Sequence, residues 1–337
     1  MSVPVVAFFN NKGGVGKTWL AYHLAWMYAD LSLPVVAVDL DPQANLTAMF
    51  LDEDELETLW DRDDQPVTVY GCLRPLLRGI GDVAEPRPQF IEEDRLLLLA
   101  GDLRLSAFEE DLSGQWPLAL SGNERAFRVL SAFWRLAQRA AQHNRAAVIL
   151  IDLGPNLGSI NRAGLVSSDY VVVPLSPDLF SLQGLRNLGP QFQRWRREWK
   201  DRLDRKPEKM DLDLPSGGMQ PLGYVVLQHA VRLDRPVKAY DKWVNRIPGE
   251  YRRHVLEQSL QEDVSPNQDP HRLALLKHYR SLMPMAQEAR KPIFHLRAAD
   301  GAIGSHALAV QDVYRDFKQL AVAIAEKVGV ASALRHL

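Results

Sequence analysis

The stretch Lys12-Gly13-Gly14-Val15-Gly16-Lys17-Thr18 decides how the first part of this chain folds. It stands between an apolar run, residues 3–9, which predicts a buried strand, and residues 19–25, which predict a helix. A glycine-rich turn in this position lets successive backbone N–H groups point inward, and the N-terminus of the helix adds partial positive charge. Lys17 would reach the terminal phosphates of a ligand, and the Thr18 hydroxyl would bind Mg²⁺. The stretch therefore predicts a phosphate-binding loop.

Three aspartates follow predicted strands that would lie beside this loop. An apolar run, residues 35–38, ends in Asp39 and Asp41, with one residue between them. At the carboxyl end of a parallel strand, such carboxylates can hold the water shell of a metal or orient an attacking water. A later apolar run, residues 147–151, ends in Asp152, which is the Walker B pattern for a carboxylate that reaches Mg²⁺ through water.

The remaining strand and helix patterns predict the fold class. Apolar runs at residues 170–175 and 222–227 predict two further buried strands, and amphipathic helical segments alternate with the strands. This alternation predicts an α/β fold, with a mostly parallel twisted sheet and helices on both faces. Because strands from both halves of the chain would belong to one sheet, residues 1–337 are expected to form a single domain.

Composition excludes several other classes of protein. The 337 residues carry a formal net charge of −2, so any binding of nucleic acid needs a local basic patch. Cys72 is the one cysteine, which excludes an intrachain disulfide and a paired-cysteine metal site, and it favours a reducing cytoplasm. No apolar run approaches the roughly 18 residues of a membrane-spanning helix. Because the first residues predict the opening strand, we do not expect a signal peptide.

Taken together, these motifs resemble the ParA/MinD family of deviant-Walker-A ATPases. The resemblance rests on the phosphate loop, the stretch Asp39-Leu40-Asp41-Pro42-Gln43 and the strand that ends in Asp152. The ParA branch is favoured by residues 96–112, which include a Leu-x-x-x-Glu pattern, by Ile247-Pro248, by residues 288–293 and by the long closing helix at 310–328. The resemblance implies ATP and Mg²⁺ as ligands and a homodimer that closes over two nucleotides. It also implies slow hydrolysis that a protein partner stimulates, and nonspecific DNA binding in the ATP state to position a cargo.

The resemblance also assigns roles to particular residues. Lys12 would reach the phosphates bound by the partner subunit, and Asp41 would position the attacking water. Thr18, Asp39 and Asp152 would serve the metal. The nucleotide would contact the whole loop, and it would also contact Trp19, Gln228 and Pro248, the last two at the adenine.

Two features depart from the family pattern. Gly154-Pro155 follows Asp152 and Leu153 where the family has two prolines, so the second switch loop is expected to be more flexible. The extra length suggests family-variable insertions around 51–95, 201–220 and 229–285. Within the first of these, residues 52–64 hold eight acids and one arginine. We expect a solvated loop there, with a docking surface for a basic partner as the alternative.

A basic stretch at residues 186–209 allows two interpretations. Phe192, Trp195 and Trp199 fall on one helix face, which is typical of an amphipathic helix that packs on a core. The alternative, compatible with the first, is that basic residues around the same helix contact DNA phosphates without reading sequence. These residues are Arg194, Arg196, Arg197 and Lys200.

Other functional classes remain open at this stage. The C-terminal tail, residues 330–337, holds one arginine and is a poor match for a membrane-targeting helix, so we do not expect a MinD-like membrane positioner. A P-loop transferase is disfavoured by Lys12. A regulatory ATPase of a multi-gene defence system would keep the same chemistry. His23 is expected to be a packed side chain rather than a metal ligand.

Overall fold

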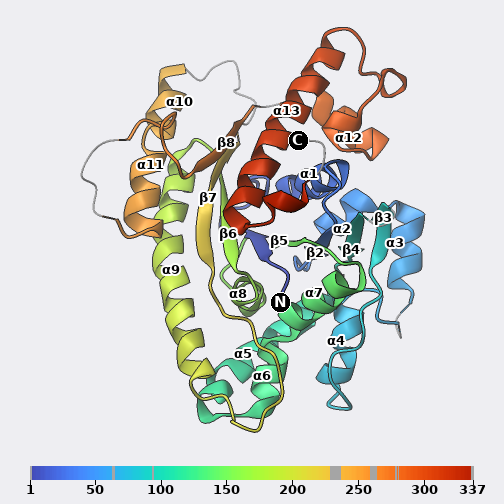
Figure 1. The fold of residues 1–337 in the computed structure, drawn as a ribbon, viewed down its shortest axis with the longest axis vertical. Helices are drawn as coiled ribbons and strands as arrows, with labels where there is room; N and C mark the ends of the chain where they lie inside the picture. The colour runs from blue at the N-terminus through green and yellow to red at the C-terminus, as the bar shows by residue number, and fades with distance from the viewer. Residues whose placement is uncertain are drawn as a thin grey trace.

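The computed structural model describes residues 2–62, 65–92, 95–227, 237–258, 264–277, 279 and 281–334. In these residues one eight-stranded sheet runs through the molecule in the order β3-β4-β2-β5-β1-β6-β7-β8 (Figure 1). The strands are β1 (Val5–Phe8), β2 (Val35–Asp39), β3 (Gln89–Glu92), β4 (Leu96–Leu99), β5 (Val148–Asp152), β6 (Tyr170–Leu175), β7 (Gln220–Leu227) and β8 (Arg272–Leu276).

The pairing of the strands confirms the predicted fold class. All neighbouring strands run parallel except β3, which pairs antiparallel with β4 at one edge. In the register of the central strands, Asp39 at the end of β2 lies beside Asp152 at the end of β5, and Phe8 of β1 lies on the other side of Asp152. The carboxyl ends of these strands therefore meet at one edge, as the sequence predicts for parallel neighbours.

Helices cover both faces of the sheet (Figure 1). One face is covered by α4 (Val69–Leu77), α5 (Phe108–Leu118), α6 (Glu124–Leu130), α7 (Ala132–His143), α8 (Ser159–Val166) and α9 (Leu179–Leu203). The other face is covered by α1 (Lys17–Asp30), α2 (Asn45–Phe50), α3 (Glu53–Trp60), α12 (Leu282–Ala289) and α13 (Ser305–Val328). Beyond β7, α10 (Val237–Val244) and α11 (Ile247–Glu250) lead into the short π-helical turn η3 (Tyr251–Val255).

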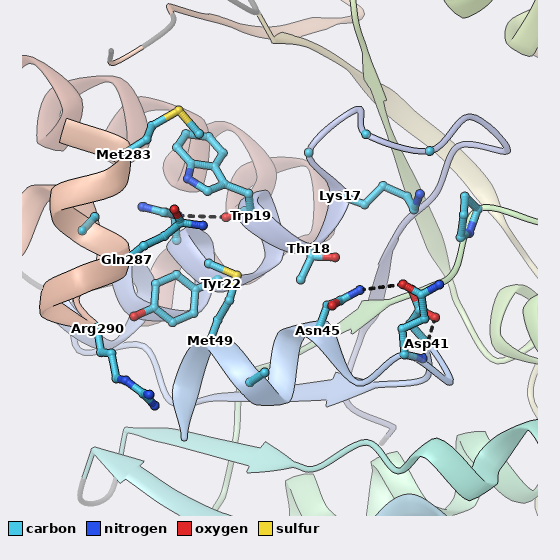
Figure 2. Close-up of a pocket in the computed structure, with 18 of the residues that line it drawn as sticks. Lys17, Thr18, Trp19, Tyr22, Asp41, Asn45, Met49, Met283, Gln287 and Arg290 are labelled. Carbon is cyan, nitrogen blue, oxygen red and sulfur yellow. Dashed lines mark hydrogen bonds between the residues drawn. The ribbon is translucent and has the colours of Figure 1, made fainter. Parts of the chain in front are cut away.

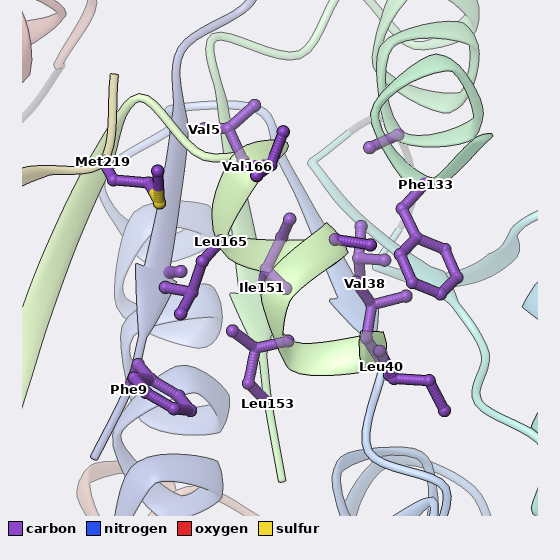
Figure 3. Close-up of a cluster of buried hydrophobic side chains, with 14 of the residues drawn as sticks. Val5, Phe9, Val38, Leu40, Phe133, Ile151, Leu153, Leu165, Val166 and Met219 are labelled. Carbon is purple, nitrogen blue, oxygen red and sulfur yellow. The ribbon is translucent and has the colours of Figure 1, made fainter. Parts of the chain in front are cut away.

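Alternation along each strand divides the apolar side chains between two cores. Val5 of β1 points into the core under α7 and α8, whereas Val6 and Phe8 point into the core under α1 and α13. Figure 3 shows the first of these cores, where Leu165 and Val166 of α8 pack on Ile151 and Leu153. Because every strand residue of β1, β2 and β5 is buried, both faces of the central sheet are covered, which is why these strands read as continuous apolar runs.

The expectation of a solvated loop at residues 52–64 is wrong for most of that segment. Residues 53–60 form helix α3, and Asp52 and Glu55 close a capping box in which each side chain accepts a backbone N–H of the other at 2.8 Å. Acidic side chains in the first turn also interact favourably with the helix dipole. The negative charge that suggested a loop instead stabilises the N-terminus of a helix.

Helix α9 is the longest helix in the part of the chain that the structure describes, and its middle packs against η3. Phe192, Trp195 and Trp199 are each no more than 1% exposed, so the predicted aromatic face is a core face. A Cβ atom at Gly189 would lie 1.5 Å from the backbone carbonyl oxygen of His254 in η3. Only glycine permits this approach of the two backbones. None of the described helices has a stretch long and apolar enough to cross a bilayer.

Candidate functional site

The predicted phosphate loop lies between β1 and α1, and its shape depends on two glycines. Gly14 and Gly16 have φ angles of +72° and +78°, which side chains rarely adopt, and a Cβ at Gly16 would also lie 2.7 Å from Leu227. Asn10 anchors the loop entrance, because its side chain donates to the Pro174 carbonyl at 2.7 Å and accepts the Lys12 N–H at 3.0 Å. No side chain caps the N-terminus of α1. The loop therefore presents a helix N-terminus with free N–H groups, as an anion site requires.

Lys17 lies inside this site and faces carboxylates. Its side chain is buried, and this burial lowers the pKa of its ammonium group. The charges of Asp152 and Asp41 oppose that shift and favour the protonated form. Lys17 is therefore a buried cation held between two acids, in the position from which a P-loop lysine contacts phosphate.

Asp39 is held by a residue to which sequence analysis assigned no role. One oxygen of its carboxylate accepts both the backbone N–H of Thr47 at 2.8 Å and the Thr47 hydroxyl at 2.7 Å. The other oxygen accepts the Asp41 N–H at 3.2 Å. Complete burial raises the pKa of Asp39 to about 7, although the bonds from Thr47 lower it in part. The Thr47 hydroxyl also accepts the Gly101 N–H at 2.7 Å, so it joins β2 to the turn after β4.

Asp152 differs from Asp39 in having no such support. Both oxygens of its carboxylate are buried without a hydrogen-bond partner of ordinary geometry among the described residues. Burial and the neighbouring Asp39 raise its pKa well above the usual value, while Thr18 and Lys17 oppose the rise. A buried carboxylate with unused oxygens beside a threonine hydroxyl is the donor set that a hydrated divalent cation prefers. These residues therefore fit Mg²⁺ at the predicted place.

Asp41 lies between the buried carboxylates of Asp39 and Asp152 and the cavity. One of its oxygens accepts the Gln43 N–H at 3.0 Å, and a Cβ at Gly154 would lie 3.3 Å from that same oxygen. The loop after β5 therefore packs directly against Asp41. Asp41 and Pro155 both line the cavity described next.

A cavity of about 760 Å³ extends from the phosphate loop across α1 to α12. Figure 2 shows its two ends. Lys17, Thr18, Asn45 and Asp41 line the polar end, near the loop. The other end is lined by Trp19, Tyr22, Met49 and Met283, with Gln287 and Arg290 at the wall formed by α12. The cavity thus combines a charged end suited to phosphates with an apolar and aromatic end suited to a flat ring.

Lys12, the second lysine of the loop, does not line this cavity. Its ammonium group pairs with the carboxylate of Asp178 at 2.5 Å and lies 5.9 Å from the centre of the Phe180 ring. Asp178 also caps α9 by accepting the Ser181 N–H at 2.9 Å. The two lysines therefore have different environments: Lys17 is buried in the site, and Lys12 is about one-quarter exposed beside it.

Comparison with known proteins agrees with this geometry. Residues 3–205 match the AAA_31 family, described as an AAA domain. The chain belongs to this family, which is of the ParA/MinD type. One relative is the chromosome partitioning protein ParA of Myxococcus xanthus, which is 28% identical over 185 residues, covering 55% of this chain and 56% of the relative. The chain matches about half the length of its curated relatives, from 42% to 62% among the first three.

Solved structures show the same fold over almost the whole chain. Protein DIP2308 of Corynebacterium diphtheriae superposes with a TM-score of 0.72 at 24% identity, over 96% of this chain and 98% of the other. The ATP complex of McdA from Cyanothece superposes with a TM-score of 0.61 at 15% identity, over 98% and 97% of the two chains. Two of the segments expected to be insertions, around 51–95 and 229–285, contribute the described strands β3 and β8 to the sheet.

In this ParA-type chain, the structure places some predicted nucleotide contacts away from the cavity. Pro248 is buried in α11 on the far side of β7, against α9, and is not among the cavity-lining residues. Gln228 lies outside the described residues. Val15 is fully buried, so its backbone alone can take part in the loop. Met283 and Gln287 line the cavity, and no sequence signal distinguishes them from ordinary residues of an amphipathic helix.

The four basic residues predicted to contact DNA have unequal environments. Arg194, Arg197 and Lys200 are exposed on α9, and Arg194 lies 3.8 Å from Glu198. Arg196 is half-buried, and its guanidinium donates to the backbone carbonyl of Met219 at 2.5 Å. Burial lowers the pKa of Arg196. The structure therefore groups three of the four residues on the surface and uses the fourth to hold the start of β7.

His23 is the packed side chain that its place in the first helix predicts. It is 1% exposed, its Nδ1 lies 2.9 Å from the Trp19 carbonyl oxygen, and its Nε2 accepts the Ile293 N–H at 3.1 Å. An imidazole that accepts on Nε2 and donates from Nδ1 is neutral, and burial correspondingly lowers its pKa to about 3. His23 therefore ties α1 to the turn before α13.

Proposed function

We propose that this chain is a ParA-like ATPase that binds ATP and Mg²⁺, closes into a homodimer over the nucleotides and reopens after slow hydrolysis. In the ATP state it binds DNA nonspecifically in the cytoplasm, and a protein partner stimulates its turnover to position a cargo. The observation that carries this proposal is the pair of lysines on one phosphate loop. Lys17 is buried against acids in the cavity, whereas Lys12 lies outside it, about one-quarter exposed and paired with Asp178.

The two ends of the cavity support a nucleoside triphosphate as the ligand. The phosphates would lie at the N-terminus of α1, against Lys17 and Thr18. The base and ribose would lie at the apolar end, where Trp19 and Met283 offer flat and polarisable surfaces and Gln287 offers a donor and an acceptor. This placement moves the expected base contacts from Pro248 to α12.

The acidic cluster supports Mg²⁺ as a second ligand. Thr18, Asp152 and Asp39 would hold the ion or its waters, and Mg²⁺, when bound, neutralises phosphate charge. Asp39 and Asp152 end neighbouring strands and are both fully buried, and the charge of Asp39 disfavours the ionised form of Asp152. A bound cation would reverse this preference and keep both carboxylates ionised.

Asp41 is the residue placed to orient water. It lines the cavity, it is held by the Gln43 N–H, and Gly154 of the following loop packs on it. Among the residues that the structure describes, no arginine lines the polar end of the cavity. Slow intrinsic turnover follows from that shortage of transition-state charge stabilisation.

The surface around Lys12 supports a second copy of the chain as the dimer partner. Leu157, Leu179 and Phe180 are 41%, 46% and 69% exposed, and they lie in the loop after β5 and the first turn of α9, next to the phosphate loop. Large exposed apolar side chains around a lysine that lies outside the cavity are suited to a protein–protein interface.

The exposed part of the basic stretch supports DNA binding. Arg194, Arg197 and Lys200 lie on the outer side of α9, while its aromatic side is buried. Three cations on one helix can contact successive phosphates without reading bases, and a dimer would present two such rows. Arg196 would contact a phosphate only through the guanidinium nitrogens that do not donate to Met219.

The test is to follow the mass of an Asp41→Ala variant and its binding to arbitrary-sequence duplex DNA, with ATP and Mg²⁺ or with ADP. Loss of Asp41 should slow hydrolysis and prolong the ATP state. We expect a dimer and DNA binding with ATP and neither with ADP. A monomer under both conditions would overturn the switch, and a dimer without DNA binding would remove DNA from the proposal.

Matched variants separate the two parts of the proposal. Lys12→Ala should retain ATP binding but lose the dimer, because Lys17 and the helix N-terminus remain. Arg197→Ala with Lys200→Ala should weaken DNA binding and leave the dimer intact. The control is Arg315→Ala with Lys327→Ala, which removes the same charge from exposed positions of α13 on the opposite face of the sheet.

A further inference from the structure

The helix that follows the second switch loop is capped by a residue from another part of the chain. Helix α8 begins at Ser159, and its N-cap residue, Gly158, supplies no side chain. The carboxylate of Glu109 on α5 takes that place: one oxygen accepts the Ser159 N–H and the other accepts the Ile160 N–H at 2.9 Å. Two N–H groups at the start of α8 are thus bound by one carboxylate, the charge that a helix N-terminus favours.

The absence of a side chain at Gly158 leaves room for the Glu109 carboxylate. A Cβ atom at Gly158 would lie 2.8 Å from the Glu109 oxygen that accepts the Ser159 N–H. Any side chain there would push the carboxylate away from the helix. Glu109 is also the glutamate of the Leu105-x-x-x-Glu109 pattern, a feature of the sequence that the proposed ATPase reaction leaves without a role.

The N-terminus of α8 contacts the second switch loop, residues 154–158, through the side chain of one residue. The Asn161 side chain is buried in the first turn of α8 and donates to the Gly154 carbonyl at 2.9 Å and the Asn156 carbonyl at 2.7 Å. These bonds fold residues 154–158 back onto the helix. Gly154 in turn packs against the Asp41 carboxylate, and Pro155 lines the cavity. The position of α8 therefore sets the position of the loop that faces Asp41.

We propose that Glu109 is a positioning residue for the ATPase reaction: by holding the N-terminus of α8 it fixes the second switch loop against Asp41. This inference rests on the proposed function for its effect on turnover, but the clamp itself is a property of the free protein. Glu109 is not among the residues that line the cavity, so it would act on the geometry of the water-orienting region and not on nucleotide affinity.

The test compares Glu109→Ala and Glu109→Gln with Glu110→Gln, an exposed neighbour on the same helix. The first readout is the exchange of individual backbone amides with solvent, followed by NMR. We expect Glu109→Ala to speed exchange at Ser159 and Ile160, and Glu109→Gln to have a smaller effect, because its amide oxygen can still accept one N–H. The control variant should exchange as the wild type does.

The second readout is the division of the effect between kcat and KM for ATP. A displaced loop should lower kcat roughly tenfold in the alanine variant and leave KM within about twofold. Unchanged exchange at both amides would overturn the clamp, and faster exchange with an unchanged kcat would overturn its role in turnover. Should the alanine variant fail to fold, the glutamine variant, of nearly the same shape, carries both readouts.

The two levels of inference can fail separately. If the wild type hydrolyses no ATP, the proposed function fails, and amide exchange still decides whether Glu109 holds α8. If the wild type is active and the glutamine variant has the wild-type kcat and wild-type exchange, the proposed function stands and the positioning role is refuted.

Discussion

Replacing Thr47 with valine should destabilise the protein through two buried hydrogen bonds. The Thr47 hydroxyl donates to Asp39 and accepts from the Gly101 N–H, both at 2.7 Å and with Thr47 fully buried. Valine has nearly the same shape, so packing is preserved. Loss of the bond to Asp39 costs about 1 kcal/mol, and the Gly101 N–H left without a partner costs about 1–3 kcal/mol more. The expected loss in free energy of unfolding is therefore ~2–4 kcal/mol.

The assay is urea unfolding followed by tryptophan fluorescence, without nucleotide and with metal chelated. Thr47→Ser is the matched control, because it keeps the hydroxyl and loses one methyl group, a change worth about 1 kcal/mol. The reasoning requires Thr47→Val to be clearly less stable than Thr47→Ser. If the valine variant is as stable as the serine variant or more so, the hydroxyl does not hold Asp39 and Gly101 together.

Three further predictions concern other parts of the structure. Burial lowers the pKa of His23 to about 3, so as pH falls below about 6.5 the unfolded chain binds a proton that the folded chain refuses. Between pH 7 and pH 5, protonation of His23 in the unfolded chain should lower the free energy of unfolding by about 2 kcal/mol. Urea unfolding at the two pH values should show that His23→Gln has lost this difference. Asp178→Asn keeps the cap of α9 but releases Lys12 from its ion pair. We expect the free energy of unfolding to change by less than about 1 kcal/mol and the ATP-dependent dimer to become tighter in sedimentation experiments. A weaker dimer would contradict this expectation. Gly189→Ala should cost about 3 kcal/mol or more because its Cβ meets the η3 backbone, whereas Gly114→Ala in α5, with nothing within 4 Å, should be neutral or slightly stabilising by thermal unfolding.

The phosphate loop and the central strands could be predicted from sequence because their signals are local. A strand buried on both faces is a continuous apolar run, and a loop that binds phosphate needs glycine where φ is positive, as at Gly14 and Gly16. The edge strands β3 and β8 gave no such signal. Their residues are mostly half-buried, so neither continuous apolar character nor a clean alternation marks them.

Contacts between distant segments could not be predicted in this way. Thr47 holds Asp39 across eight residues, but its hydroxyl also binds Gly101, 54 residues away. Glu109 caps a helix 50 residues along the chain. The local sequence of neither residue indicates which distant backbone groups its side chain binds, although Glu109 belongs to the Leu-x-x-x-Glu pattern. The helix at 53–60 does have a local signal, because Asp52 and Glu55 have the spacing of a capping box.

Helix α9 makes a mechanical link between the two ends of the proposed switch. Its first residue follows Asp178, the partner of Lys12, and its last turns carry Arg197 and Lys200. At 1.5 Å per residue, its 25 residues form a rod about 37 Å long. Residue 203 lies 14 residues, or about 21 Å, beyond Gly189, so a tilt of about 5° about Gly189 would move the end of the helix by ~2 Å. A small rotation of the first turn of α9 would thus displace Arg197 and Lys200 relative to a bound duplex. The close contact between Gly189 and η3 would be the pivot.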